Sequence, residues 1–313
     1  MPPCRRALAL TLVAVAIAAG AVRAQAPVFR SGTDAVRVDV LVADARGAPV
    51  PGLTPKDFVL RDNGVAQSIA AVAFEDLPLH LVLALDTSSS VEGESFERLV
   101  AAARGLLEEL RPMDAASLVV FSHVLSVQPL ASGRVDDAEQ SLRRLSAFGR
   151  TSVFDATWVS LLNAGRPGFR SLVVLLSDGF DNRSWLGLDD VVAFAKRVDS
   201  VVYCVRVPPQ LPDVPEWMQR MRRRGFKATV RAGTHNFLEK IAEESGGRVL
   251  RADTDADLRP ALLRILDEFR RRYVLTYVPE GVDVGGWHAI EVTVRGKAAT
   301  VTARRGYQRD WPK

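Results

Sequence analysis

Three oxygen-bearing side chains follow one apolar run in the first third of the chain. The apolar residues 81–85 follow His80 and lead into Asp86-Thr-Ser-Ser-Ser90. Asp86, Ser88 and Ser90 therefore occupy alternate positions. Alternate residues of an extended chain point to the same side. One carboxylate and two hydroxyls are oxygen ligands that suit a hard divalent cation. Serine and aspartate are also frequent at turns and helix N-caps, so this cluster alone leaves a purely structural role open.

Two later segments add donors of the same kind. Thr151 lies in a glycine-led loop before an expected helix, and Asp178 follows the aliphatic run 171–176. A continuous aliphatic run predicts a strand that is buried on both faces. Because parallel strands present their carboxyl ends at one sheet edge, we expect Asp178 to reach the Asp86 cluster. The segments together predict one divalent-cation site.

The order of these motifs, D-x-S-x-S, then Thr, then Asp, resembles that of the von Willebrand factor type A (VWA) domain. In that family the motifs form the metal-ion-dependent adhesion site, and all the motif positions are filled here. The resemblance covers about residues 79–275. Within the superfamily the chain is most similar to the secreted bacterial proteins called VWFA-related acidobacterial domain proteins.

The resemblance implies a role for each motif residue. Ser88, Ser90 and Thr151 would offer hydroxyls to the metal, and Asp86 and Asp178 would act directly or through water. Mg²⁺ is the first choice because it favours octahedral oxygen coordination and keeps exchangeable waters, while Mn²⁺ and Ca²⁺ stay open. An Asp or Glu carboxylate of a protein partner would fill the exchangeable position. The implied function is metal-dependent protein binding or adhesion.

The amino terminus predicts export. Arg5 and Arg6 precede the apolar stretch 7–22, and Val22-Arg-Ala24 resembles a cleavage site, so residues 1–24 fit a signal peptide. The apolar stretch, about 16 residues, is short for a membrane-spanning helix. We expect a periplasmic or extracellular protein, with retention of the segment as an anchor as the alternative.

Charge and cysteine content narrow the partners and chemistry. Removal of residues 1–24 takes away three arginines, which lowers 41 basic residues to 38 against 37 acidic ones. A nearly neutral chain does not indicate a nucleic-acid partner. Cys204 would then be the single cysteine, and its apolar surroundings in the sequence favour a buried, unreactive thiol.

The pattern of elements predicts an α/β fold. Strands alternate with helices of ten to twenty residues, as in a doubly wound, mostly parallel, Rossmann-like sheet with its site at the switch point. The expected strands are 80–86, 117–122, 171–177, 201–207 and 248–250, with 125–129 as an edge hairpin. The expected helices are 92–110, 138–145, 153–163, 188–198, 234–245 and 255–271.

Both ends of the mature chain show the alternating, turn-bounded pattern of β-strands. Residues 25–78 form an expected β module, residues 79–272 the VWA domain, and residues 273–313 a β-meander. The meander is too small to bury much apolar surface by itself. We therefore expect both ends to build one small β-sandwich that carries the VWA domain as an insertion.

Residues 208–232 form a proline- and arginine-rich insertion. Within it, 217–231 combines an apolar stripe with arginines, which would suit contact with an envelope or membrane surface. A solvated helix is the competing interpretation. The same feature supports an alternative function, a structural envelope scaffold whose contacts are made without metal by the β module or by this insertion.

Enzymatic chemistry is not indicated. A serine nucleophile needs a base, yet the four histidines are scattered and no G-x-S-x-G motif occurs. Phosphotransfer through Asp86 would need a second aspartate two residues later, where Ser88 stands. We therefore expect a non-enzymatic protein.

Overall fold

The computed structural model describes residues 35–74, 77–130, 140–207, 236–252, 254–296 and 299–309, apart from the side chains of Ser90, Ser95 and Asp255. All of these residues belong to one structural unit, Asp34–Lys313. The expected signal peptide 1–24 and the insertion 208–232 lie outside the described residues. The predicted domain boundaries stay predictions.

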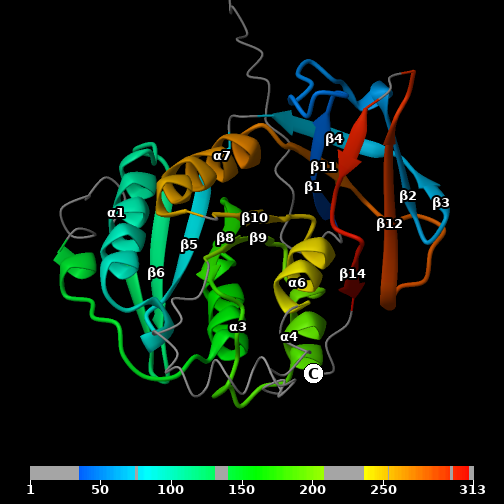
Figure 1. The fold of residues 1–313 in the computed structure, drawn as a ribbon. Coiled ribbons are helices and arrows are strands. Elements are labelled where there is room, and N and C mark those ends of the chain that lie inside the picture. The colour runs from blue at the N-terminus through cyan, green and yellow to red at the C-terminus, as the bar shows by residue number, and fades with distance from the viewer. Residues whose placement is uncertain are drawn as a thin grey trace, which may run out of the picture. The chain divides into compact units, whose positions relative to one another are not determined.

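The central sheet has six strands, and its order confirms the doubly wound prediction (Figure 1). Across the sheet the strands are β10 (Val249–Arg251), β9 (Val201–Arg206), β8 (Arg170–Ser177), β5 (Leu79–Asp86), β6 (Ala115–Phe121) and β7 (Leu125–Leu130). All pairs are parallel except β6 with β7. From β5 the chain runs outward to β6 and then returns to β8 on the other side, so the switch point lies between β5 and β8, where open α/β sheets bind ligands.

Helices cover both faces of this sheet (Figure 1). On one face lie α1 (Glu94–Glu108) and α7 (Leu258–Arg270); on the other lie α3 (Val153–Ala164), α4 (Leu188–Ala195) and α6 (Phe237–Ser245). All eight residues of β5 are buried. Alternate side chains enter the two cores, for example Leu83 on the α1 side and Val82 on the α3 side. The uninterrupted aliphatic run is thus explained by burial on both faces.

Strands from the two ends of the chain form two antiparallel four-stranded sheets. One contains β13 (Thr300–Thr302), β1 (Val36–Ala43), β11 (Tyr273–Tyr277) and β4 (Ile69–Phe74); the other contains β14 (Gly306–Arg309), β12 (Gly286–Val294), β2 (Phe58–Asp62) and β3 (Val65–Gln67). Apolar residues of both sheets share one core. The predicted sandwich of N- and C-terminal strands is confirmed, and we call it the β module.

The expected C-terminal β-meander is wrong. Successive strands β11, β12 and β13 alternate between the two sheets instead of pairing with one another. A meander would leave the small sheet with a single apolar face to cover, whereas alternation lets both inner faces contribute to one core.

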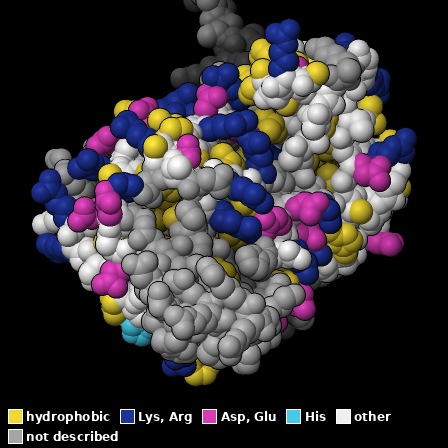
Figure 2. Space-filling view, in the orientation of Figure 1, with side chains coloured by type: hydrophobic (Ala, Val, Ile, Leu, Met, Phe, Trp, Pro, Cys, Tyr) yellow, Lys and Arg dark blue, Asp and Glu magenta, His cyan; other side chains and the backbone are white. Residues whose placement is uncertain are grey.

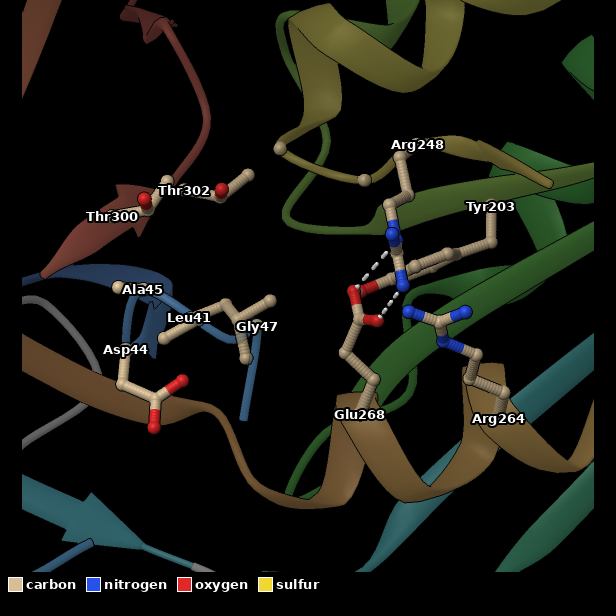
Figure 3. A pocket seen from close by; sticks show the side chains of 13 residues that line it. Leu41, Asp44, Ala45, Gly47, Tyr203, Arg248, Arg264, Glu268, Thr300 and Thr302 are labelled. Carbon is tan, nitrogen blue, oxygen red and sulfur yellow. Dashed lines mark hydrogen bonds and ion pairs between the residues drawn. The ribbon is translucent and has the colours of Figure 1, made fainter. Parts of the chain in front are cut away.

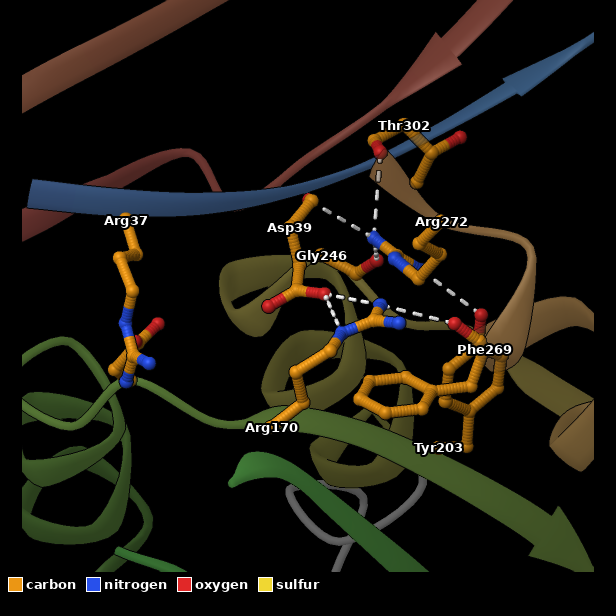
Figure 4. A network of polar contacts seen from close by, with 9 residues as sticks. Arg37, Asp39, Arg170, Tyr203, Gly246, Phe269, Arg272 and Thr302 are labelled. Carbon is orange, nitrogen blue, oxygen red and sulfur yellow. Dashed lines mark hydrogen bonds and ion pairs between the residues drawn. The ribbon is translucent and has the colours of Figure 1, made fainter. Parts of the chain in front are cut away.

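Buried arginines join the β module to the central sheet (Figure 4). Arg170 of β8 donates from Nε to the Asp39 carboxylate of β1 at 3.0 Å and from Nη2 to the carbonyl of Phe269 at 2.9 Å. Arg272 is fully buried and donates to the hydroxyl of Tyr203 at 2.9 Å and to the carbonyl of Gly246 at 2.6 Å. Buried guanidinium groups need such partners, so these contacts fix how the module sits on the sheet.

A polar cluster lies in the core of the β module. The fully buried carboxylate of Asp62 accepts hydrogen bonds from the hydroxyls of Tyr277 at 2.8 Å and Tyr307 at 2.9 Å. His288 Nδ1 lies 2.8 Å from its other oxygen, and the imidazole ring stacks on Tyr307. Hydrogen-bonding partners therefore surround this carboxylate, which stabilises it in an apolar core.

Candidate functional site

Two aspartates lie close together at the switch point. Asp86 ends β5 and Asp178 follows β8, the neighbouring parallel strand. Both are buried, with 0% and 5% of their surface exposed. Burial, together with the neighbouring charge of Asp178, raises the pKa of Asp86 to about 6. The site therefore concentrates negative charge in a place where water cannot screen it well.

The Asp86 carboxylate is held at both oxygens. The backbone N–H of Ser88 donates to Oδ1 at 2.9 Å, and the hydroxyl of Ser177 donates to Oδ2 at 2.8 Å. The N–H of Gly179 donates in turn to the Ser177 hydroxyl at 3.1 Å. Ser177 thus links the β5 end to the β8 end. Sequence reasoning missed it, although it stands directly before Asp178.

The loop after β5 is bonded to the loop that precedes Thr151. The N–H of Ser89 donates to the carbonyl of Gly149 at 3.0 Å, and the N–H of Phe148 donates to the carbonyl of Thr87 at 2.8 Å. Gly149 has φ +83°, and an added Cβ would lie 2.0 Å from Nδ1 of His123. Only glycine fits this turn, which explains the glycine before Thr151 in the motif.

Thr151 is bonded to the loop after β8. Its N–H donates to Oδ1 of Asn182 at 3.0 Å, and the N–H of Asn182 donates back to the carbonyl of Thr151 at 3.1 Å. Thr151 is 3% exposed. Because each loop bonds to the next, the three predicted motif segments meet at one edge of the sheet.

Four of the predicted site residues are buried at this edge: Asp86, Ser88, Thr151 and Asp178. The side chain of Ser90 lies outside the described part of the structure. The expected alternation holds from Asp86 to Ser88, whose backbone is extended, and ends there because residues Ser89–Val91 form a 3₁₀ turn. A turn rather than an extended chain therefore positions the backbone of Ser90.

The described residues contain no metal site of the kind built from several histidine, cysteine or carboxylate ligands. No group of three or more His, Cys, Asp or Glu side chains there is arranged to hold a metal ion. Cys204 is buried and burial raises the pKa of its thiol, which disfavours the reactive thiolate. Both ring nitrogens of His80 have partners, the carbonyl of Ala164 at 3.1 Å and the hydroxyl of Ser117 at 3.0 Å. These two side chains have structural roles in the sheet.

Comparison with known proteins identifies the fold family. Residues 80–262, more than half of the chain, match the family model described as von Willebrand factor type A domain. The chain belongs to the VWA domain family. The narrower assignment to the acidobacterial family stays a prediction.

Curated relatives share the VWA region only in part. An uncharacterized protein of Synechocystis sp. is 32% identical over 109 residues, which cover 33% of this chain and 26% of that protein. Human inter-alpha-trypsin inhibitor heavy chain H4 is 26% identical over 197 residues, which cover 58% of this chain and 19% of the relative. The chain therefore spans about a quarter or less of the length of these relatives.

Solved structures similar to this VWA protein include two with broad coverage. The von Willebrand factor type A structure from Catenulispora acidiphila has 13% identity and a TM-score of 0.49, covering 91% of this chain and 76% of the other. The manganese-loaded TRAP protein of Plasmodium vivax has 14% identity and a TM-score of 0.41, covering 82% and 100%. Among the described residues, no helix is long and apolar enough to cross a membrane.

Proposed function

We propose that this VWA protein binds a protein partner through a divalent cation held at the switch point. The observation that carries the proposal is the buried pair Asp86 and Asp178, in which the charge of Asp178 disfavours the charged form of Asp86. A divalent cation between like charges removes this electrostatic cost. The buried hydroxyl-bearing residues Ser88 and Thr151 adjoin the pair.

The donor set favours a cation that keeps an open position. Asp86, Ser88, Ser90, Thr151 and Asp178 would hold it, with Mg²⁺ as the first choice and Mn²⁺ or Ca²⁺ as alternatives. Hydroxyls are neutral and weak ligands, so the ion stays attractive to an incoming anion. An Asp or Glu side chain of the partner supplies that anion. Metal binding is thus coupled to recognition of an acidic residue, and the protein is not an enzyme.

The place of action follows from the amino terminus. The signal-like segment 1–24 directs the chain out of the cytoplasm, to the periplasm or the cell exterior. Free divalent cations and surface proteins are both accessible there. The protein therefore acts as an exported binding or adhesion module.

The test combines metal uptake with partner capture. Isothermal titration calorimetry on the full chain should detect binding of one Mg²⁺ or Mn²⁺, and capture of a partner from the producing cell's envelope should be reversed by EDTA. Thr151→Val removes a hydroxyl from the site and should abolish both. Thr157→Val is the matched control, because the buried hydroxyl of Thr157 donates to the carbonyl of Val153 within α3.

Two results would contradict this function. One is a folded protein that takes up no divalent cation. The other is partner capture that EDTA leaves intact but that is lost when Arg222, Arg223 and Arg224 are neutralised, which would favour the structural envelope scaffold with contacts through 217–231.

A further inference from the structure

Among the described residues, the backbone groups on the outer edge of β10 have no strand partner. β10 is the last strand on its side of the central sheet and pairs only with β9 among the described strands. The N–H of Cys204 donates to the carbonyl of Arg248, and the N–H of Ala252 donates to the carbonyl of Arg206, both at 3.1 Å. In a parallel ladder only alternate residues of a strand bond to its neighbour. The peptide groups of Val249 and Arg251 therefore point away from β9.

A groove runs along this edge. It has a volume of about 500 Å³ and lies between β10 and the first turns of α7, with Val249, Arg251, Pro260 and Arg264 among its lining residues. A second hollow of about 300 Å³ adjoins it and shares Arg264 and Arg248. Residues of β10 and α7 thus form one continuous concave surface.

Arginines dominate the charge of this surface. Figure 2 shows Lys and Arg side chains gathered on the face where α7 and β10 lie in Figure 1. Arg248 is ion-paired with Glu268, and Arg264 lies beside that pair (Figure 3). Arg251 and Arg264 are exposed, and among the described residues no acidic side chain forms an ion pair with either.

One acidic residue, Asp257, also lines the groove, where Arg248, Arg251 and Arg264 outnumber it. It accepts hydrogen bonds from the N–H of Thr254 at 2.9 Å and from the hydroxyl of Thr254 at 2.6 Å. As far as the structure describes the acidic side chains, the groove therefore presents two guanidinium groups without an ion pair beside two outward peptide groups.

We propose that the β10 edge binds an extended acidic segment of a partner protein, which pairs with Val249 and Arg251 as an added strand. The outward N–H and C=O groups match the alternating donors and acceptors of a peptide backbone. Arg251 and Arg264 select carboxylates on the incoming strand. This site is separate from the cation site, because β9 and β8 lie between β10 and β5 in the sheet.

The chemistry disfavours two other occupants. A phosphate or sugar polyanion could meet the arginines, but it lacks the regular N–H donors that the outward carbonyls of β10 accept. The insertion 208–232 of this chain is itself basic, with Arg220, Arg222, Arg223 and Arg224 against Asp213 and Glu216. Its net charge therefore has the same sign as that of Arg251 and Arg264, so it does not match the acidic segment that these arginines would select.

The test uses a defined peptide and the full chain. A fluorescent peptide with alternating glutamate and valine should bind in an anisotropy titration, and a lysine–valine peptide should not. The double substitution Arg251→Glu and Arg264→Glu should weaken binding about tenfold or more, since two attractive pairs become repulsive. Arg295→Glu, an exposed arginine in the β module, is the matched control and should change affinity less than twofold.

Hydrogen exchange separates strand addition from simple charge attraction. The bound peptide should slow exchange at the amides of Val249 and Arg251, and a peptide with N-methylated alternate residues should bind weakly. EDTA should not affect binding, so failure here is distinguishable from failure of the cation site. The proposal is overturned by absence of glutamate–valine peptide binding, by equal binding of polyphosphate, or by unchanged exchange at both amides.

Discussion

The switch-point edge of the VWA sheet and the core of the β module each bury an aspartate, but with different surroundings. Asp62 lies inside the module, where two tyrosine hydroxyls and a histidine face its oxygens. Asp86 lies at a strand end beside a second carboxylate, and its pKa is raised to about 6. A complete set of hydrogen-bonding partners makes the buried carboxylate of Asp62 part of the architecture. A like charge beside it makes the same residue type a candidate for binding a cation.

The largest effect on stability should come from the polar cluster around Asp62 in the β module. Asp62→Ala leaves the Tyr277 and Tyr307 hydroxyls and His288 without their acceptor, so we expect the free energy of unfolding to fall by about 3 kcal/mol. Urea denaturation measures this change. A loss below about 1 kcal/mol would mean that the cluster is not essential to the module. Mg²⁺ uptake should survive in any fraction that folds.

Cation binding should stabilise the folded protein by mass action. At a Mg²⁺ concentration of about 100 times the dissociation constant, the free energy of unfolding should rise by about 2.7 kcal/mol. Urea denaturation with and without Mg²⁺ measures this gain. Asp178→Asn should abolish it, and Thr157→Val should preserve it. If Mg²⁺ raised the free energy of unfolding equally in both variants, Asp178 would not be a ligand of the cation.

Without metal, the same Asp178→Asn substitution should stabilise the protein slightly. The pKa of Asp86 is raised in the folded state, so the folded protein binds a proton more tightly and stability falls as pH rises from about 4 toward 6. Removing the neighbouring charge lowers that pKa and should add about 1 kcal/mol at pH 7 in EDTA. The Asn side chain keeps an acceptor for the N–H of Phe180. A loss of stability at pH 7 would contradict the like-charge description of the site.

The smallest effect should come from Tyr307→Phe. Tyr277 donates to the same oxygen of Asp62, so loss of the second hydroxyl should cost about 0.5 to 1 kcal/mol. Thermal or urea unfolding measures it, with Tyr277→Phe as the comparison. If Tyr307→Phe lowered the free energy of unfolding more than Asp62→Ala does, Asp62 would not be the central residue of the polar cluster.

The sequence was most informative where one physical rule dominates. The aliphatic runs of β5 and β8 predicted the buried parallel strands and the edge where Asp86 and Asp178 meet, because burial on both faces leaves little choice of residue type. Strand alternation at both ends of the chain predicted the shared sandwich. It did not predict how successive strands are divided between the two sheets, because that depends on which faces share a core.

Features that depend on tertiary contact were missed. Asp62 directly precedes a hairpin turn at Asn63-Gly64, where both turn residues have positive φ. Its link to Tyr277 and His288 joins residues more than 200 positions apart, which no local pattern reveals. Ser177 escaped notice for the same reason, since its role depends on the parallel neighbour that carries Asp86. The 3₁₀ turn at Ser89–Val91 also overrode the alternation expected for Ser90.

The register of β4 with β11 has a consequence for how the nascent chain folds. Phe74 lies opposite Tyr273 in that antiparallel pair, and the whole inserted domain is translated between them. At typical synthesis rates of about 5 to 20 residues per second, the first half of the sandwich waits roughly ten to forty seconds for its missing strands. Until Tyr273 is synthesised, β1 and β4 lack their common partner β11, so their backbone hydrogen-bonding groups are exposed. Exposed strand edges of this kind favour aggregation. Premature termination anywhere inside the VWA region would leave those edges permanently exposed.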